Sequence, residues 1–543
     1  MTRRIVYCRV RELLRSLAPF TLGLAGGTGT SGCYSDNCVD AFLCEIPPPE
    51  PSPCDGDPAS APALDMCGVF VSEQGDDNDA GTKAAPMKTL QHAIGLAASG
   101  RGHGEAPTRR VYACGGSFQE KITLPSGVDL WGGRRCAGGD WSYRGSFGGP
   151  DHPTIIAPPE GIPLRVITGE EEGATSTVFG VRVEAADASA IDEKSSIAMI
   201  LSPGTRAIVR ASAIVAGNGK DGEPGGDAPR ERANDGLEGN DGVSACSADF
   251  ATGALAVVTV CGDGTESTGG DGGYGGLESG GDGAPGQPKA MENPEGYGLA
   301  GLGADMARCT EGTHGADGAD GGRAEGAVGI GHLTEEGWIG ERGEGGKKGG
   351  VGQGGGGGGG SRSRGEMTAC PADLPQAGAA GGSGGSGGCG GLGGKGGGYG
   401  GSSIGIVALW GSALTLEATR VTTGNGGNGG VGGTGQPGGY GRWGGDGGKG
   451  FTGPITWGAC RGGWGGRGGR GGDAGGGLGG HSLGVASVGA YVSLAPSAIF
   501  NQGNAGVGGL AGNAAPGDQV GQGTDGIPTF WYRFDAPDPE PPR

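Results

Sequence analysis

Apolar residues along this chain gather in three short regions, and the long stretches between them contain few. The first region runs from about Cys67 to Gly217 and holds β-branched segments such as KITLPSGVDLWGG, VFGVRVEA and AIVRASAIVAG. Segments of this kind, separated by Gly or Pro, are typical of short strands that end at turns. One helix is also predicted here, beginning near Pro86. The positions that share its apolar face are Leu90, Ala93, Ile94 and Ala97.

A unit of constant length recurs in the three apolar regions. Its copies are SIAMILSPGTRAIVRASAIVAGN from Ser196, SIGIVALWGSALTLEATRVTTGN from Ser403 and SLGVASVGAYVSLAPSAIFNQGN from Ser482, and the first Ser lies 22 residues before the last Asn in each copy. A constant spacing of this size is what one coil of a β-solenoid needs. The alternative is three separate strand pairs in a sandwich. On the first interpretation, the segments that lie in neighbouring coils are those around Ile208, Leu416 and Leu494.

Glycine dominates the chain between about Gly217 and Gly526, largely in Gly-Gly-X triplets such as GGSGGSGGCGGLGGKGGG from Gly381. The chain has 137 glycines in 543 residues, against an average usage of about 7%. A Gly-Gly-X run buries no apolar face and loses much backbone entropy when it becomes ordered. The triplets suit an extended helix with three residues per turn, although Pro is too rare for collagen. We therefore leave two alternatives open, polyglycine-II-like helices side by side or disorder.

The chain is acidic, with a formal charge of −20 at pH 7. Net negative charge repels nucleic acid and anionic membrane surfaces. The run GGWGGRGGRGGD from Gly462 follows Arg461 and places Trp464, Arg467 and Arg470 at three-residue intervals, and it resembles an RNA-binding RGG box. The run is short, and we expect these side chains simply to face water. The sequence therefore predicts no nucleic-acid partner.

The fourteen cysteines favour disulfides over a metal site. Cys8 lies in a segment that resembles an export signal and Cys33 in a candidate lipidation site, so the remaining number is even. The others occur singly, whereas zinc sites need ligands at short spacing. Disulfides in an oxidising compartment are the better interpretation. The pairs that we expect first are Cys114 with Cys136 and Cys246 with Cys261.

The N-terminus has the order of segments found in a bacterial export signal. Five arginines up to Arg15 precede a short apolar stretch at 17–25, and Thr30–Cys33 resembles a lipoprotein box without its usual Leu. We expect Cys33 to carry lipid, so that the chain contacts a membrane only through this anchor. The alternative is a mis-assigned start or a cytoplasmic basic tail. No later stretch is long and apolar enough to span a membrane.

A strand, a helix start and a second strand follow one another in a recognisable order in the first apolar region. They are Val69–Ser72, Pro-Met-Lys-Thr-Leu at 86–90 and Gly-Val-Asp-Leu-Trp-Gly-Gly at 127–133. Through these motifs, residues 68–217 resemble the pectate-lyase-like right-handed parallel β-helix superfamily. The resemblance implies an all-β fold with an N-terminal capping helix, which covers a sheet end that would otherwise offer unpaired edges.

The Gly-Gly-X runs are similar in composition to those of the bacterial PGRS proteins, the polymorphic Gly-rich sequence group. This resemblance covers more than half of the chain, although the PE domain associated with many such proteins is not recognisable here. It implies a secreted or surface-exposed protein, and no catalytic residue is carried over.

These patterns together divide the chain into nine consecutive parts. They are a signal peptide with a lipoprotein box (1–33), a Cys- and Pro-rich tether (34–66), the N-terminal part of a β-helix (67–217), a glycine-rich insertion (218–402), a β-helix coil (403–425), a second insertion (426–481), a second coil (482–504), a glycine-rich loop (505–527) and a C-terminal tail (528–543).

Candidate chemistry on this framework is sparse. Polysaccharide lyases hold Ca²⁺ with several carboxylates beside a base, and hydrolases need two carboxyl groups. Glu184 and Glu417 stand almost alone on the predicted coils. A weak calcium candidate is the run Asp76, Asp77, Asn78 and Asp79, but Asp, Asn and Gly also favour an ordinary turn.

We therefore expect an exported, non-enzymatic structural or adhesive surface protein that displays glycine-rich loops from a β-helix. No cofactor is predicted. The partners that this interpretation leaves open are envelope polysaccharide and other copies of the chain. The alternative is a secreted β-helix polysaccharide lyase or hydrolase, which outward-facing carboxylate and basic clusters on one sheet would favour.

Overall fold

The computed structural model describes residues 52–100, 109–146, 149–150, 152–188, 194–289, 292–364, 370–451 and 457–535. The expected signal peptide, Cys33 and most of the tether lie outside these residues. Within them the protein is nearly all-β and its main sheets are parallel. The helical segments there are a 3-10 turn, η1 (Asp65–Cys67), and one helix, α3 (Leu90–Ala98).

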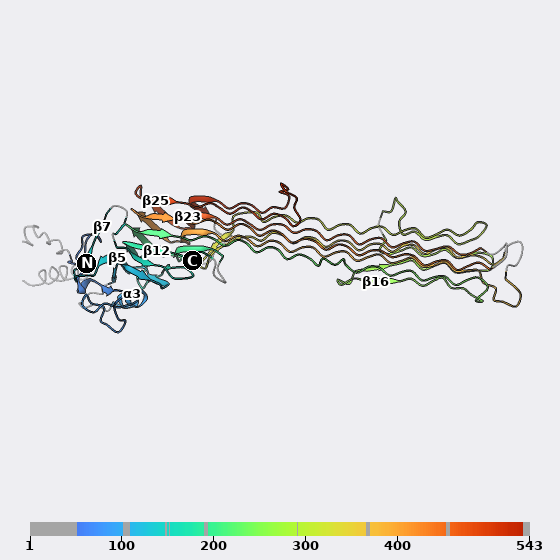
Figure 1. Ribbon diagram of the computed structural model, residues 1–543, viewed down its shortest axis with the longest axis horizontal. Coiled ribbons are helices and arrows are strands. Elements are labelled where there is room, and N and C mark those ends of the chain that lie inside the picture. The colour runs from blue at the N-terminus through green and yellow to red at the C-terminus, as the bar shows by residue number, and fades with distance from the viewer. Residues whose placement is uncertain are drawn as a thin grey trace, which may run out of the picture. The chain divides into compact units, whose positions relative to one another are not determined.

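Three parallel sheets form the strand-rich part of the molecule (Figure 1). The first consists of β1 (Val69–Val71), β2 (Arg110–Cys114), β5 (Asp129–Arg135), β11 (Thr175–Phe179), β14 (Arg206–Arg210), β21 (Ala413–Glu417) and β24 (Tyr491–Leu494), with β6 (Ser142–Tyr143) antiparallel to β5. The second consists of β3 (Gly116–Phe118), β9 (Thr154–Ile156), β12 (Val181–Glu184), β15 (Ala213–Val215), β22 (Arg420–Thr422) and β25 (Ile499–Asn501). The third consists of β4 (Ile122–Pro125), β10 (Leu164–Ile167), β13 (Ser196–Leu201), β20 (Ser403–Ala408), β23 (Ser482–Val488) and β26 (Pro528–Phe534).

The three 22-residue units lie side by side in register. Each unit contributes one strand to the third sheet, then one to the first and one to the second. Ser196 pairs with Ser403, and Ser403 pairs with Ser482. In the first sheet, Leu416 lies between Val209 and Leu494. The prediction that these distant segments are neighbours is confirmed, and the alternative of three separate strand pairs is wrong.

The main hydrophobic core draws side chains from all three sheets and from α3. Thr89 caps the helix by accepting a hydrogen bond from the amide of His92. The carboxylates of Asp77 and Glu120 accept hydrogen bonds from further amides at this helix start, those of Thr89 and Leu90. The predicted helical face is the buried one, because Leu90, Ala93, Ile94 and Ala97 are all in the core.

The glycine-rich segments are ordered and hydrogen-bonded to one another. They run alongside each other as extended lines in Figure 1, and we call them the glycine bundle. Every third amide of a segment donates to the same neighbouring segment: Gly385 donates to Gly463 and Gly388 to Gly466, both at 3.0 Å, and the series continues along the two segments. The bundle comprises residues 219–245, 251–257, 268–287, 298–327, 341–361, 377–402, 424–449, 459–480 and 503–527.

Glycine is required where one segment approaches the next. A Cβ built on Gly357 would overlap the carbonyl group of Asp271, and one on Gly384 would overlap that of Gly355. Overlaps of this kind with backbone atoms occur throughout the bundle. Since backbone atoms cannot move aside as a flexible side chain can, the close approach excludes every larger residue.

Three two-stranded antiparallel sheets accompany the parallel sheets and the glycine bundle. Two lie within the first insertion, and the third belongs to the sheet region. They are β16 (Val258–Val260) with β17 (Glu266–Thr268), β18 (His332–Thr334) with β19 (Gly337–Ile339), and β7 (Gly145–Ser146) with β8 (Gly149–Pro150). The segment 528–543, expected as a C-terminal tail, begins with a strand of the third sheet, because β26 pairs with β23 from Pro528 to Phe534. Trp531 of this strand packs against the main core.

Two adjacent glycines provide a matched test of the packing. A Cβ on Gly321 would overlap the carbonyl oxygen of Lys347, whereas one on Gly322 would meet no atom within 4 Å. We expect Gly321→Ala to lower the free energy of unfolding by about 1–3 kcal/mol, as overpacking does. Gly322→Ala should be neutral or stabilise by up to about 1 kcal/mol, because it restricts the unfolded chain. Thermal or denaturant unfolding measures both, and equal effects of the two substitutions would contradict the close packing.

Candidate functional site

The two strand carboxylates lie in different sheets. Glu184 ends β12 and accepts a hydrogen bond from Arg182 at 2.8 Å. Glu417 ends β21 and lies 3.7 Å from Arg210. Glycoside hydrolysis needs two carboxyl groups on either side of one bond. Each glutamate instead has one arginine partner, so these residues do not form such a pair.

The acidic run after β1 is occupied by its own hydrogen bonds. Asp76 accepts from the amide of Asn78 at 3.0 Å, and Asp77 accepts from the amides of Lys88 and Thr89 at 2.9 and 2.8 Å. These bonds lower the pKa of Asp76, and for Asp77 the bonds to Thr89 and Lys88 outweigh burial and also lower its pKa. Among the described residues no group of three or more His, Cys, Asp or Glu is placed to hold a metal ion. The run is therefore a turn that leads into α3.

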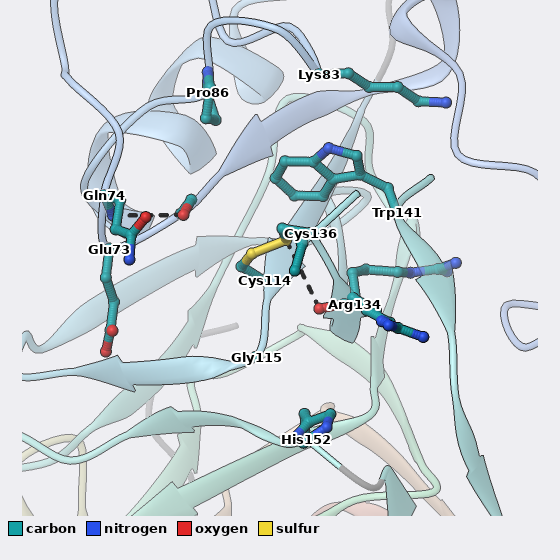
Figure 2. Close-up of a pocket in the computed structure, with 13 residues that line it drawn as sticks. Glu73, Gln74, Lys83, Pro86, Cys114, Gly115, Arg134, Cys136, Trp141 and His152 are labelled. Atoms are coloured by element: carbon teal, nitrogen blue, oxygen red, sulfur yellow. Dashed lines mark hydrogen bonds between the residues drawn. A yellow bond between two sulfur atoms is a disulfide. The ribbon is translucent and has the colours of Figure 1, made fainter. Parts of the chain in front are cut away.

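A cavity of 680 Å³ lies beside the disulfide between Cys114 and Cys136 (Figure 2). Glu73 is the single carboxylate among the residues that line it. This carboxylate accepts a hydrogen bond from the amide of Ser117. His152 lines another part of the cavity wall. With one carboxylate that is already engaged, the cavity does not provide the acid and base of a hydrolase.

Arg134, in the wall of this cavity, is a structural residue. Its side chain is buried and donates a hydrogen bond to the carbonyl oxygen of Pro58 at 2.7 Å. Its guanidinium also lies 5.3 Å from the ring of Tyr112 and 5.6 Å from that of Trp131. Burial lowers the pKa of Arg134 to about 10, so the group stays protonated at neutral pH. It ties the segment that precedes β1 to the first sheet.

Exposed aromatic side chains gather on one face of the glycine bundle. Tyr440, Trp443 and Trp464 are 42%, 51% and 40% exposed. The ring centroids of Trp443 and Trp464 are 4.2 Å apart, and His314 lies 5.5 Å from Trp464. Two arginines flank Tyr440. We call these residues the aromatic face; they are Arg232, His314, Tyr440, Trp443, Trp464 and Arg467.

The arginines of this face cover the ring of Tyr440 beside a second cavity. The guanidinium of Arg232 lies 3.7 Å from the ring centroid and that of Arg467 lies 5.2 Å from it. The cavity has a volume of 450 Å³, and Asp317 and Asp320 also line it. The sequence run with arginine and tryptophan therefore faces water, as expected, but it does so next to aromatic residues from another segment.

Asp-Gly and Asn-Gly pairs clamp neighbouring segments together. Asp317 accepts from the amide of Arg467 at 2.7 Å, while the amide of Gly318 donates to the carbonyl oxygen of Arg467 at 2.7 Å. The sequence analysis did not predict this paired hydrogen bonding, although the repeated Asp-Gly and Asn-Gly pairs could have indicated it. The same arrangement is formed by Asn218, Asp221, Asp235, Asp241, Asp320, Asn425 and Asn428, each with the glycine that follows it.

Five disulfides join the ten described cysteines. Cys114 is bonded to Cys136, as expected. The expected pair of Cys246 with Cys261 is wrong, because the returning segment 377–402 and the residues before it supply both partners. The other bonds are Cys54–Cys67, Cys246–Cys370, Cys261–Cys389 and Cys309–Cys460.

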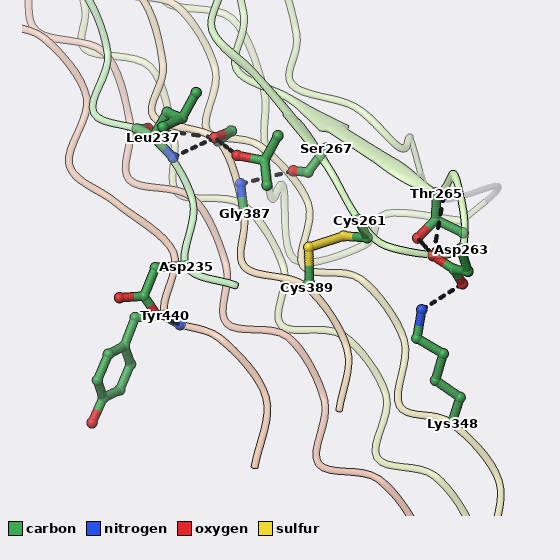
Figure 3. The surroundings of a disulfide bond; sticks show 12 residues. Asp235, Leu237, Cys261, Asp263, Thr265, Ser267, Lys348, Gly387, Cys389 and Tyr440 are labelled. Carbon is green, nitrogen blue, oxygen red and sulfur yellow. Dashed lines mark hydrogen bonds and ion pairs between the residues drawn. A yellow bond between two sulfur atoms is a disulfide. The ribbon is translucent and has the colours of Figure 1, made fainter. Parts of the chain in front are cut away.

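Figure 3 shows that the bond between Cys261 and Cys389 joins the turn after β16 to the bundle. Near it, the amide of Gly387 donates to Ser267 at 2.7 Å. An ion pair between Asp263 and Lys348 holds the same turn and lowers the pKa of Asp263.

Removing this cross-link tests the long-range pairing. We expect Cys261→Ser with Cys389→Ser to destabilise the bundle by roughly 2–5 kcal/mol, because the bond closes a long loop. Hydrogen exchange at Gly387 and melting temperature measure the effect. The control is Cys54→Ser with Cys67→Ser, which should leave exchange at Gly387 unchanged. A disulfide-linked peptide that joins Cys246 to Cys261 in a non-reducing digest would contradict the pairing.

His481 lies where the glycine bundle meets the third sheet, and it is 1% exposed. Its Nδ1 accepts from the amide of Ile527 at 2.9 Å, and its Nε2 lies 2.8 Å from the carbonyl oxygen of Ile330. Because Nδ1 accepts a hydrogen bond and the carbonyl oxygen of Ile330 can only accept one, Nε2 must be the nitrogen that carries the proton of the neutral ring. Burial lowers the pKa of His481 below its ordinary value of 6.5.

This burial predicts a loss of stability in mild acid. Below pH 6.5 the unfolded chain takes up a proton at His481 that the folded chain does not, so stability falls as the pH falls. We expect the melting temperature to decrease between pH 7.5 and 5.5, and His481→Gln to show a smaller decrease. Equal pH dependence of the two proteins would show that another group is responsible.

Comparison with protein-family models, with curated proteins and with solved structures found no match to this chain. Among the residues that the structure describes, no helix is both long and apolar enough to cross a membrane. The five disulfides are typical of proteins that fold in an oxidising environment.

Proposed function

We propose that this chain is an exported, non-enzymatic structural or adhesive protein that presents a glycine bundle from a right-handed parallel β-helix. The observation that carries the proposal is the lateral hydrogen bonding of the bundle, in which every third amide of a segment meets the same neighbouring segment. Such a body buries glycine backbone and the X side chains of its inner segments, and it leaves the X side chains of its outer segments exposed, as at Tyr440, Trp443 and Trp464. It is suited to display and contact.

Two features support the finer description of the architecture. The three sheets receive one strand each from successive units and keep the same parallel register, which is how the coils of a β-helix stack. The three-residue interval of the amides matches a polyglycine-II-like helix, which has three residues per turn. Both features agree with the resemblance of 68–217 to the pectate-lyase-like superfamily.

The chemistry of the described residues favours the adhesive role over the alternative of a polysaccharide lyase or hydrolase. Glu184 and Glu417 lie in separate sheets, and Glu73 alone supplies a carboxylate to the larger cavity. The disulfides agree with export, and lipid on Cys33 would hold the protein at the cell envelope, as its resemblance to PGRS proteins also implies.

The partners that we propose are envelope polysaccharide or other copies of the chain. Contacts would be made through exposed X side chains, which recur along the outer segments. Many weak contacts at regular spacing raise the overall affinity without a single deep pocket.

The three insertions leave and return at neighbouring points, so they can be removed together. Lys220 accepts from Gly401 at 2.7 Å, Gly427 from Gly480 at 2.8 Å and Gly506 from Gly526 at 2.9 Å. Replacing 221–400, 428–479 and 507–525 by short glycine linkers removes both cysteines of each bundle disulfide. The main core contains no residue from these ranges, although the removal also takes Leu333, Trp338 and Leu478 from a second apolar cluster on the third sheet.

We expect this bundle-lacking chain to keep its β-sheet circular dichroism and cooperative melting. Beads coated with it should be retained on isolated envelope material, or clump with each other, at least tenfold less than beads coated with the full chain. Full retention by the bundle-lacking chain would contradict the adhesive role. A Cys33→Ala chain with an intact bundle is the control, since it removes the lipid anchor and should adhere normally on beads.

A further inference from the structure

We propose that the aromatic face of the glycine bundle binds a linear acidic polysaccharide, through stacking on Trp443 and Trp464 and ion pairing with Arg232 and Arg467. The inference rests on the proposed adhesive function and names both its site and its ligand class.

The side chains of the face form rows with a regular spacing along the segments. Trp464, Arg467 and Arg470 follow one another at three-residue intervals on one segment, and Tyr440 and Trp443 do so on the next. In an extended three-residue helix this interval is about 9 Å, from a rise of about 3.1 Å per residue. Three successive positions therefore span roughly 19 Å in line. A linear polymer with its own repeat can contact such a row at several points.

The tryptophans supply the apolar part of the site. Both are exposed by two fifths or more, and their ring centroids lie 4.2 Å apart with planes at 36°. Aromatic side chains carry much apolar area with few rotatable bonds, so they offer a preformed platform. The C–H faces of a sugar ring match such a platform, and hydroxyl groups at the ring edge remain free for polar contacts.

A break in the triplet period places one of the arginines. Asp227 accepts a hydrogen bond from the amide of Thr434, which lies 207 residues later in the sequence. Asp235 accepts one from the amide of Tyr440, which lies 205 residues later. Two extra residues are therefore accommodated between Asp227 and Asp235, and Arg232 lies in this bulge. The buried side chain of Gln436 supports the bulge by donating to the carbonyl oxygen of Glu231 at 2.8 Å.

Two of the three arginines that line the cavity beside Tyr440 are available to an anion, next to the carboxylates of Asp317 and Asp320. Arg470 is paired with Asp473 at 2.7 Å, but among the described residues Arg232 and Arg467 have no carboxylate within ion-pair distance. A planar guanidinium can bind a carboxylate through two parallel hydrogen bonds. Uronate groups would thus neutralise two arginines that the chain itself leaves open, despite the net charge of −20.

The aspartates of the cavity add hydroxyl recognition. Asp317 and Asp320 each use Oδ1 to accept an amide of the adjacent segment, at 2.7 Å in both cases. Within the described part of the chain, Oδ2 of each has no hydrogen bond of its own. These oxygens can accept from sugar hydroxyls, while the clamps hold the carboxylates in place.

Isothermal titration of the full chain with hexagalacturonate and with neutral cellohexaose tests the proposal. We expect the hexagalacturonate to bind and its affinity to fall as salt rises, with cellohexaose at least tenfold weaker. Trp464→Ala and Arg467→Gln should each weaken binding by about tenfold, the loss of roughly one contact of 1.4 kcal/mol. The controls are Trp457→Ala and Arg342→Gln, which lie outside the face and should bind like the unaltered chain.

Melting temperatures identify variants that fail to fold, and quenching of tryptophan fluorescence by the sugar in the unaltered chain provides a readout that needs no variant. Absence of binding, equal binding of the neutral sugar, or unchanged affinity in both face variants would overturn the proposal. Self-association of the full chain that is lost in Trp464→Ala would also overturn it, since a second copy would then occupy the face. The adhesive function is tested separately, by bead retention. If the bundle-lacking chain loses retention, the adhesive function is supported even where the polysaccharide proposal fails.

Discussion

Carbonyl groups in the glycine bundle occupy the space that side chains of the neighbouring segments would need. At Gly357 and Gly384, for instance, a Cβ would overlap backbone of the adjoining segment. This approach lets every third amide reach a carbonyl of one given neighbour, and in inner runs such as 354–361 each amide reaches a carbonyl of one neighbour or another, at a net gain of about 0.5–1.5 kcal/mol per bond. Ordering one residue costs about 1–2 kcal/mol, and glycine is at the upper end. Hydrogen bonds between segments are therefore too weak to order one segment alone, and the bundle needs ends that are already fixed. The sheets provide one end, and disulfides such as Cys309–Cys460 cross-link the rest.

The same packing decides what the X positions do. Because glycines fill the contacts between segments, X residues carry nearly all of the side-chain chemistry of the bundle. Aspartate and asparagine at these positions accept the amide of a facing residue, as Asp317 does for Arg467. Many of the acidic residues thus have a structural task, which explains part of the negative charge without a cationic partner. The bulge around Arg232 departs from the pattern, and it does so where exposed aromatic side chains gather.

Sequence reasoning was most reliable where a repeat or a periodicity marks the residues that belong together. The 22-residue spacing anticipated the register of Ser196, Ser403 and Ser482, and the apolar face of α3 followed directly from its periodicity. It failed where partners lie far apart and no repeat marks them. Cys246 lies near Cys261 in sequence but bonds Cys370, because the chain runs out along one segment and returns along another. The aromatic face joins residues of four segments of the glycine bundle, and no single window of sequence contains them.

Register is the remaining problem for a chain of triplets, because a slip of three residues brings glycine opposite glycine again. Glycine packing alone therefore cannot select one alignment, and the specific residues must do so. The clamp of Asp221 on Asn428 keeps an offset of 207 residues near the sheets, and that of Asp241 on Asp446 keeps 205 beyond the bulge. A slip between these two segments would separate both clamps and move Arg232 away from Tyr440. The residues that interrupt the repeat thus determine the single structure that the repeat can form, and they also determine where its distinctive surface lies.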